Sequence, residues 1–141
     1  MGFSVIAAAA ILGLTLFMAV EIIASDLLPT IEDMNKSYSE MKDRYQNQLQ
    51  SDINITIVIR SANGSNYDYN VSVENTGSAT LFTKGFQILI NGSAYQSSCS
   101  GENLYPESTV FFQIRNVTGA GSQRVKVITN NGIADYYTST G

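Results

Sequence analysis

The pattern of hydrophobic and polar positions changes twice along the chain, first to a helical repeat and then to a strict alternation. The first twenty residues, MGFSVIAAAAILGLTLFMAV, carry no charged side chain, and apolar residues resume after Glu21. A helical run of this length crosses the hydrocarbon core of a bilayer, which is about 30 Å thick. The sequence therefore predicts a transmembrane helix over residues 1–28.

This apolar run has two interpretations, a retained membrane anchor and a cleaved secretory signal. A signal has a basic start and a shorter apolar stretch, whereas no Lys or Arg precedes this long run. A retained anchor is favoured. The acids that follow it, Asp26, Glu32 and Asp33, favour the N-terminus in the cytoplasm and the remainder outside. Glu21 is expected near the outer headgroups, or paired with a cation on a partner helix.

Residues 29–50 follow a helical repeat and are predicted to form a stalk. Their apolar side chains recur at spacings of three and four: Ile31, Met34, Tyr38, Met41 and Tyr45. Pro29 predicts either a boundary or a kink before this helix. Extended backwards, the stripe includes Ala10, Gly13 and Phe17, and small residues permit close approach of helices in lipid. The stripe is expected to pack on the chain's own β domain or to form an oligomer seam with another helix.

From Ser51 onward the apolar period is two. Ile53, Ile55, Ile57 and Ile59 alternate with other residues, which predicts a strand with all four on its buried face. Expected strands cover residues 53–60, 67–74, 86–90, 95–98, 109–115, 123–129 and 134–138, with Asn-Gly pairs between several of them. About seven strands without a helix between them predict an antiparallel immunoglobulin-like sandwich over residues 51–141, with a barrel as the alternative. The fold class is therefore α+β.

The composition argues against several classes of function. The chain has 141 residues, a net charge of −4, no His and one Cys. An acidic balance argues against nucleic acid binding. Without His, a phosphate-binding glycine loop or a calcium-loop spacing, we expect neither an enzyme nor a metal or other cofactor. Cys99 has no second cysteine in the chain with which to form an intramolecular disulfide.

Two sets of exposed residues are candidates for modification or binding. The sequon Asn-x-Ser/Thr, which accepts N-linked glycans outside the cell, occurs at six positions, Asn35, Asn54, Asn63, Asn70, Asn91 and Asn116. Predicted protein-binding loop residues are Lys84, Asn103, Leu104, Tyr105 and Asn130. Tyr105 is the kind of aromatic residue that anchors an interface, but it is equally expected to cap the end of the sandwich.

The segments MGFSVIAAAAILG, MAVEII, SYSEMKDR and QSDINITI, in this order, resemble the archaellum accessory protein F family (FlaF, also called ArlF). The resemblance is strongest over residues 1–60. It implies a single-span protein of the archaeal cytoplasmic membrane with an immunoglobulin-like domain outside. That domain is expected to bind the S-layer protein, together with accessory protein G, and to act as a stator of the archaellum. Archaellins are further candidate partners.

The strongest rival is a type IV pilin-like filament subunit, which also joins an apolar helix to a β head. Such precursors usually carry a short basic leader and a carboxylate near the start of the mature helix. Neither feature precedes or opens this apolar run, in which Glu21 is the only acid. The accessory protein is therefore favoured over the filament subunit.

Overall fold

The computed structural model describes residues 2–140, and their contacts form two compact units, Met1–Asp43 and Arg44–Gly141. The predicted segments begin at Met1 and end at Gly141, and these two residues lie outside the described part of the chain. The predicted segment boundaries after residues 28 and 50 stay predictions.

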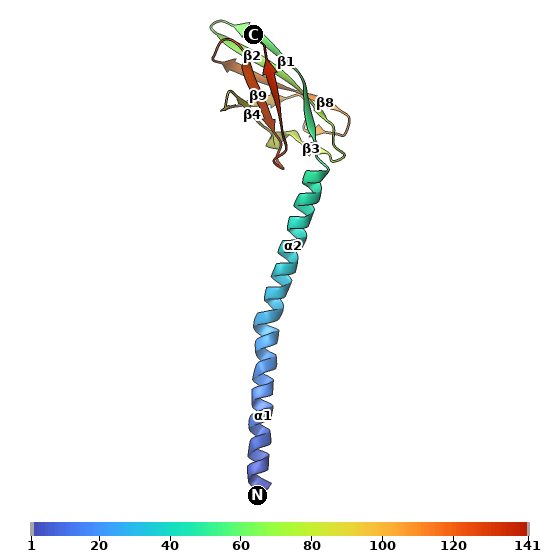
Figure 1. Cartoon of the computed structure of the whole chain (residues 1–141), viewed down its shortest axis with the longest axis vertical. Helices are drawn as coiled ribbons and strands as arrows, with labels where there is room; N and C mark the ends of the chain where they lie inside the picture. Colours follow the sequence, from blue (N-terminus) through green and yellow to red (C-terminus); the bar gives the residue numbers. More distant parts are fainter. Residues whose placement is uncertain (1, 141) are drawn as a thin grey trace. The chain divides into compact units, whose positions relative to one another are not determined.

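A single continuous helix runs from Gly2 to Leu49 (Figure 1). It comprises α1 (Gly2–Ile22), a π-helical turn η1 (Ile23–Leu27) and α2 (Leu28–Leu49). By length and composition, it is long and apolar enough to cross a membrane. The helix forms because its first half contains almost only Ala, Leu, Ile and other apolar residues, and its second half is rich in Glu, Lys, Met and Gln.

The helix continues through Pro29 rather than ending there. Proline lacks an N–H, and its ring collides with the carbonyl four residues earlier. The π turn directly before Pro29 widens the helix at this point, with the Leu28 N–H donating to the Ile23 carbonyl. The Thr30 hydroxyl donates to the Asp26 carbonyl at 2.7 Å. A π turn therefore accommodates the proline without breaking the helix.

The remainder of the chain forms two four-stranded antiparallel sheets and a two-stranded ribbon (Figure 1). The first sheet has the order β1 (Ile53–Asn63), β2 (Asn66–Asn75), β8 (Thr109–Val117), β6 (Ser97–Cys99). The second has the order β10 (Ala134–Ser139), β9 (Gln123–Ile128), β4 (Gln87–Ile90), β5 (Ser93–Tyr95). The ribbon pairs β3 (Leu81–Phe82) with β7 (Asn103–Leu104), and a 3-10 turn, η2 (Thr83–Gly85), precedes β4.

This strand order confirms the predicted immunoglobulin-like sandwich, and the two open sheets replace the alternative barrel. The strand count differs, with ten strands among the described residues instead of about seven. The strand expected at 95–98 is two strands, β5 and β6, because the chain leaves one sheet at Tyr95 and enters the other at Ser97. β3 and β7 are too short to produce an alternating pattern in the sequence.

The core lies between the two sheets. Its largest fully buried side chains include Tyr69, Phe112, Ile88, Ile90 and Ile114. The rings of Phe86 and Phe112 stack across the sheets with centroids 5.5 Å apart. Full burial of such a side chain stabilises the fold by about 1.5–3 kcal/mol. Packing therefore stabilises the sandwich, whose one cysteine is unpaired.

The prediction that Ile57 and Ile59 face the core is wrong. The pairing of β1 with β2 shifts between Ile55 and Ile57, which leaves Thr56 as an extra residue in β1. Such a bulge exchanges the two faces of the strand beyond it. Ile57 and Ile59 are therefore 48% and 52% exposed, while Val58 packs against the core.

Tyr69 provides a test of the core. Its side chain is 1% exposed, and its hydroxyl has no hydrogen-bond partner among the described residues. Burying an unpaired hydroxyl is unfavourable. We expect Tyr69→Phe to raise the free energy of unfolding by about 1 kcal/mol, measured by denaturant titration. A comparable loss of stability would show that the hydroxyl has a partner in solution.

Candidate interaction surfaces

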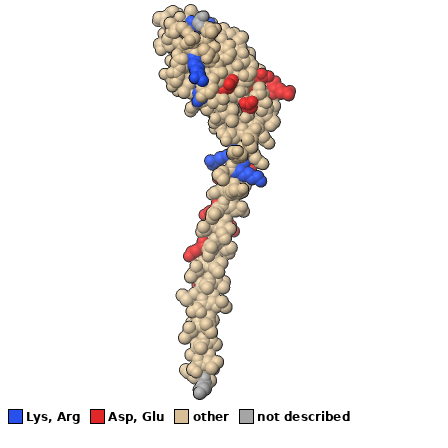
Figure 2. Space-filling model, in the orientation of Figure 1, with Lys and Arg blue, Asp and Glu red and all other residues tan. Residues whose placement is uncertain are grey.

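The predicted helix seam is fully accessible within the described structure. Ala10, Gly13 and Phe17 on α1, and Ile31, Met34, Tyr38 and Met41 on α2, are exposed. Tyr45, on the part of α2 that belongs to the second unit, is exposed as well. On the face drawn in Figure 2, the N-terminal part of the helix displays no charged residue. Every described residue from 2 to 49 is exposed.

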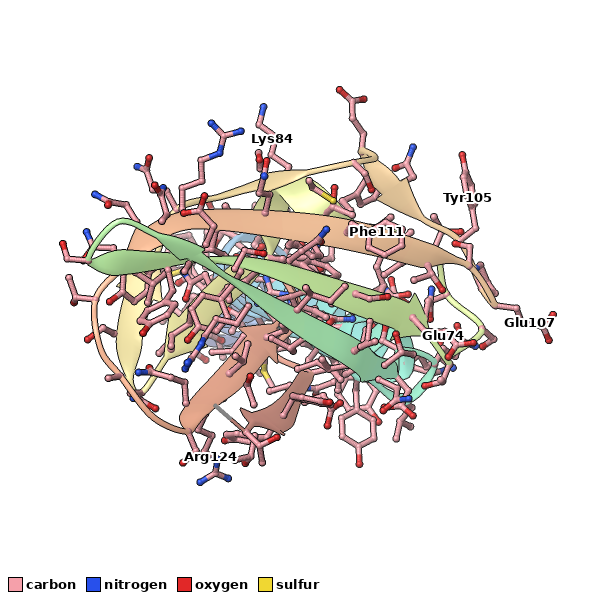
Figure 3. The ribbon with its side chains drawn as sticks, turned by 90° about the horizontal axis from the view of Figure 1, so that it is seen from above. Glu74, Lys84, Tyr105, Glu107, Phe111 and Arg124 are labelled. Atoms are coloured by element: carbon pink, nitrogen blue, oxygen red, sulfur yellow. The ribbon has the colours of Figure 1, made fainter. Side chains whose placement is uncertain are left out.

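A second apolar surface lies on the outer face of the first sheet, and we call Ile57, Ile59 and Phe111 the outer apolar row. Strand register places Ile57 opposite Ser72, and Ser72 opposite Phe111, so the three strands β1, β2 and β8 share this face. Phe111 is 48% exposed, and Figure 3 shows its ring projecting from the ribbon. This surface is not predictable from the alternation of apolar residues, which places Ile57 and Ile59 on the buried face. Only the bulge at Thr56 turns the two isoleucines outward.

All six sequon asparagines are exposed. Their side-chain amides differ in what they contact. Asn63 Nδ2 donates to the Asp68 carboxylate, and Asn91 Nδ2 donates to Gln123 Oε1 at 2.8 Å. Asn116 accepts a hydrogen bond from Asn66. The remaining three, Asn35, Asn54 and Asn70, show no side-chain hydrogen bond within residues 2–140. Glycosylation stays a prediction. The amides of these three residues are the most accessible to it, because no hydrogen bond to another described residue would have to be broken.

The Asp68 carboxylate ties these turns together. It accepts hydrogen bonds from the backbone N–H of Asn116 at 2.9 Å and from the Asn63 amide. These bonds, with a smaller contribution from the nearby Arg115 charge, hold the pKa of Asp68 below its usual value. Asp68 therefore acts as a structural group between the β1–β2 hairpin and the end of β8.

The predicted binding loops are only partly exposed. Lys84 in η2, Tyr105 and Asn130 are exposed, and Asn103 is half-buried. Leu104 is fully buried, so the prediction that it is an exposed loop residue is wrong. The cause is the ribbon, in which Leu104 pairs with Leu81 and both face the core. Tyr105 is 58% exposed, and in Figure 3 its side chain points away from the sandwich.

The junction between the end of α2 and the sandwich was not foreseen. The turn at residues 76–79 clamps the first residues after the helix, since the N–H groups of Thr76 and Gly77 donate to the Asp52 carbonyl. The N–H groups of Ser78 and Ala79 donate to the Gln50 carbonyl at 2.8 and 3.1 Å. This turn is the residue 76–79 clamp. It lies entirely within the second unit.

Side chains reinforce the junction from the other side. Ser51 is 5% exposed, and its hydroxyl donates to the Asn47 carbonyl at 2.6 Å, which caps the last turn of α2. Asn131 donates to the same hydroxyl, and Gln48 donates to the Asn131 carbonyl. The last turn of α2 is therefore bonded to the β9–β10 loop. In the sequence Ser51 and Asn131 are ordinary turn formers, and their role depends on contacts between residues about 80 positions apart.

Cys99 is half-buried and unpaired. It packs against the core and lines a cavity of about 420 Å³ beside Thr83 and Phe112. Among residues 2–140, no group of three or more His, Cys, Asp or Glu side chains is arranged to hold a metal ion.

Comparison with known proteins supports the fold. No protein-family model matches the chain, and no curated protein matches it. Among solved structures, the archaellum periplasmic stator protein FlaG from Sulfolobus acidocaldarius matches with a TM-score of 0.55 at 16% identity, over 63% of this chain and 99% of that one. A chain of the archaellum periplasmic stator protein complex FlaF and FlaG from the same organism matches with a TM-score of 0.51 at 16% identity. The match covers 62% of this chain and 87% of that one. At this identity, the likeness is one of fold.

Proposed function

We propose that this chain is a membrane-anchored component of the archaellum stator, with its sandwich outside the cytoplasmic membrane and bound to the S-layer protein. One observation carries the proposal: an apolar helix of membrane-spanning length leads into a sandwich with the fold of archaellum periplasmic stator proteins. The sequence resemblance to the accessory protein F family supports the same assignment independently. The solved structures include both FlaG and the FlaF–FlaG complex, so the choice of F over G rests on the resemblance alone.

The helix supports membrane anchoring. Its first twenty uncharged residues extend about 30 Å as a helix, which matches the hydrocarbon thickness. The apolar side chains of α1 are all exposed, and lipid is the environment in which such side chains are most stable. The acids after the span are consistent with the orientation expected above, in which the N-terminus is cytoplasmic.

The junction supports a mechanical role. A stator transmits force between a fixed lattice and the membrane, and a flexible linker would dissipate that force as chain motion. Here four backbone hydrogen bonds of the residue 76–79 clamp join the turn to Gln50 and Asp52, and Ser51 and Asn131 add side-chain bonds. An ordered junction of this kind suits an anchor that carries mechanical load.

We assign the S-layer contact to the outer apolar row. Exposed apolar residues that are contiguous on one face mark protein interaction sites more often than scattered ones do, and an aromatic residue near the centre of a contact typically contributes most of its energy. Phe111 is the one aromatic residue of the row, and its strand β8 is an inner strand of the sheet, between β2 and β6. The helix seam provides the second contact, either between copies of the chain or with an accessory protein G or archaellin helix.

The test uses the full-length chain in liposomes, sedimented with purified S-layer protein. We expect binding to the wild type, and a loss of about tenfold in affinity for Phe111→Ser. Phe82→Ser is the matched control, because Phe82 is also exposed, at 63%, but lies on β3 in the separate ribbon. Absence of S-layer binding by the wild type would contradict the proposal. A filament with the apolar helices of many copies in a continuous core would favour the pilin-like alternative.

A further inference from the structure

The outer face of the second sheet carries a pocket that the stator proposal does not use. It has a volume of about 550 Å³, and its lining residues are Leu89, Asn91, Gly92, Arg124, Lys126 and Tyr136. Figure 3 shows Arg124 and Phe111 on opposite sides of the sandwich. The pocket and the outer apolar row are therefore separate surfaces, and each can be altered without changing the other.

Strand register assembles this pocket. Lys126 in β9 pairs with Leu89 in β4 on one side and with Tyr136 in β10 on the other, so the three form one row across the sheet. Arg124 lies two residues before Lys126, and residues two apart in a strand share a face. The Arg124 N–H donates to Asn91 Oδ1 at 2.8 Å. The arginine backbone is thus fixed to the β4–β5 turn, in which Asn91 and Gly92 both have a positive φ.

Both cations of the pocket lack a carboxylate partner. The Arg124 guanidinium lies 4.4 Å from the centre of the Tyr136 ring, and Lys126 Nζ lies 5.0 Å from it. Within residues 2–140 neither forms an ion pair. The adjacent acid in β10, Asp135, accepts a hydrogen bond from the Ile55 N–H and is not available to them. Two positive charges beside one ring, without an ion-pair partner, favour binding of an anion at this pocket.

We propose that this pocket binds a sugar that carries a carboxylate, namely a uronic acid unit. A guanidinium and an ammonium together recognise a carboxylate through charge-assisted hydrogen bonds. A half-exposed tyrosine and the Leu89 side chain provide the apolar surface that the C–H face of a sugar ring covers. Tyr136 is 49% exposed, so its ring is accessible to a ligand. A plain inorganic anion would use the two cations and leave these apolar surfaces uncovered.

The test compares three probes on the isotope-labelled full-length chain in detergent micelles, with backbone amide signals followed by NMR. The probes are methyl β-D-glucuronide, methyl β-D-glucoside, which has the same ring without the carboxylate, and sodium sulfate. We expect the glucuronide to shift the signals of Arg124, Lys126 and Tyr136 saturably. The glucoside, which lacks the carboxylate, and sulfate, which lacks the sugar ring, are each expected to bind about tenfold more weakly. This difference is equivalent to one charge-assisted hydrogen bond at an exposed site.

Variants localise the binding. Arg124→Gln and Lys126→Gln are each expected to weaken glucuronide binding by about tenfold, whereas Arg115→Gln and Lys84→Gln, exposed cations elsewhere on the sandwich, leave it unchanged. No saturable shift by the glucuronide, equal affinity for sulfate, or equal weakening by the control variants would each overturn the proposal. S-layer sedimentation of the same variants reports on the stator proposal separately, because it depends on the opposite sheet.

Discussion

Gly77→Ala is expected to destabilise the sandwich by about 3 kcal/mol or more, the cost of forcing atoms into a packed backbone contact. A Cβ at this position would lie 2.5 Å from both the Asp52 nitrogen and the Gln50 carbonyl oxygen. Both are backbone atoms and cannot rotate away. The residue 76–79 clamp would have to separate from the chain after α2, with loss of its four hydrogen bonds. Denaturant unfolding of the full-length chain measures the change.

Gly101→Ala is the matched control. Its added Cβ meets Val110 and Asn103 only at 3.6 and 3.7 Å, which is ordinary contact. We expect a change within about 0.5 kcal/mol, as for most substitutions away from special features. Under the proposed stator role, Gly77→Ala is also expected to abolish swimming in cells, because the junction proposed to carry the load would be opened. Equal stability of Gly77→Ala and wild type would mean that the clamp is loose in solution.

Local sequence patterns were sufficient for the helix, for most strands and for the fold class. The uncharged run predicted α1, the spacing of Ile31, Met34 and Tyr38 predicted α2, and alternation predicted most strands. These features succeed because helix and strand periodicity depend on near neighbours in the chain. The bulge at Thr56 shows the limit, since nothing in INITIVIR distinguishes a regular strand from one that exchanges faces midway.

The interaction surfaces depended on contacts that sequence does not display. Arg124, Lys126 and Tyr136 are recognisable as a cluster only once the β9–β10 register is known. Likewise, Asn75-Thr76-Gly77-Ser78 reads as an ordinary turn, and its clamp on Gln50 and Asp52 appears only in three dimensions. The prediction that Leu104 is exposed was wrong for the same reason, because Leu104 lies in a two-residue strand that pairs with β3 and faces the core. Long-range pairing, not local propensity, decides these positions.

Asn75→Ala is the second substitution with a large expected effect. Asn75 is fully buried, and its amide makes three hydrogen bonds to backbone groups. Nδ2 donates to the carbonyls of Ala79 and Leu104 at 2.8 and 3.0 Å, and Oδ1 accepts from the Gly77 N–H at 3.0 Å. Alanine would leave the two carbonyls without this partner, whereas the Gly77 N–H would keep its hydrogen bond to the Asp52 carbonyl. Because each buried unsatisfied group costs about 1–3 kcal/mol, and some regain water, we expect a total loss of about 3–4 kcal/mol.

Asn54→Ala is the control, since Asn54 is an exposed strand asparagine without a side-chain hydrogen bond within residues 2–140. It is expected to change stability by no more than about 0.5 kcal/mol. Asn75 and Gly77 act on the same turn, so the double variant is expected to lose less than the sum of the two single losses. Once the turn has separated from the chain after α2, the second substitution has little left to disrupt. Strict additivity would instead mean that Asn75 stabilises the end of β2 and the Leu104 loop independently of the junction.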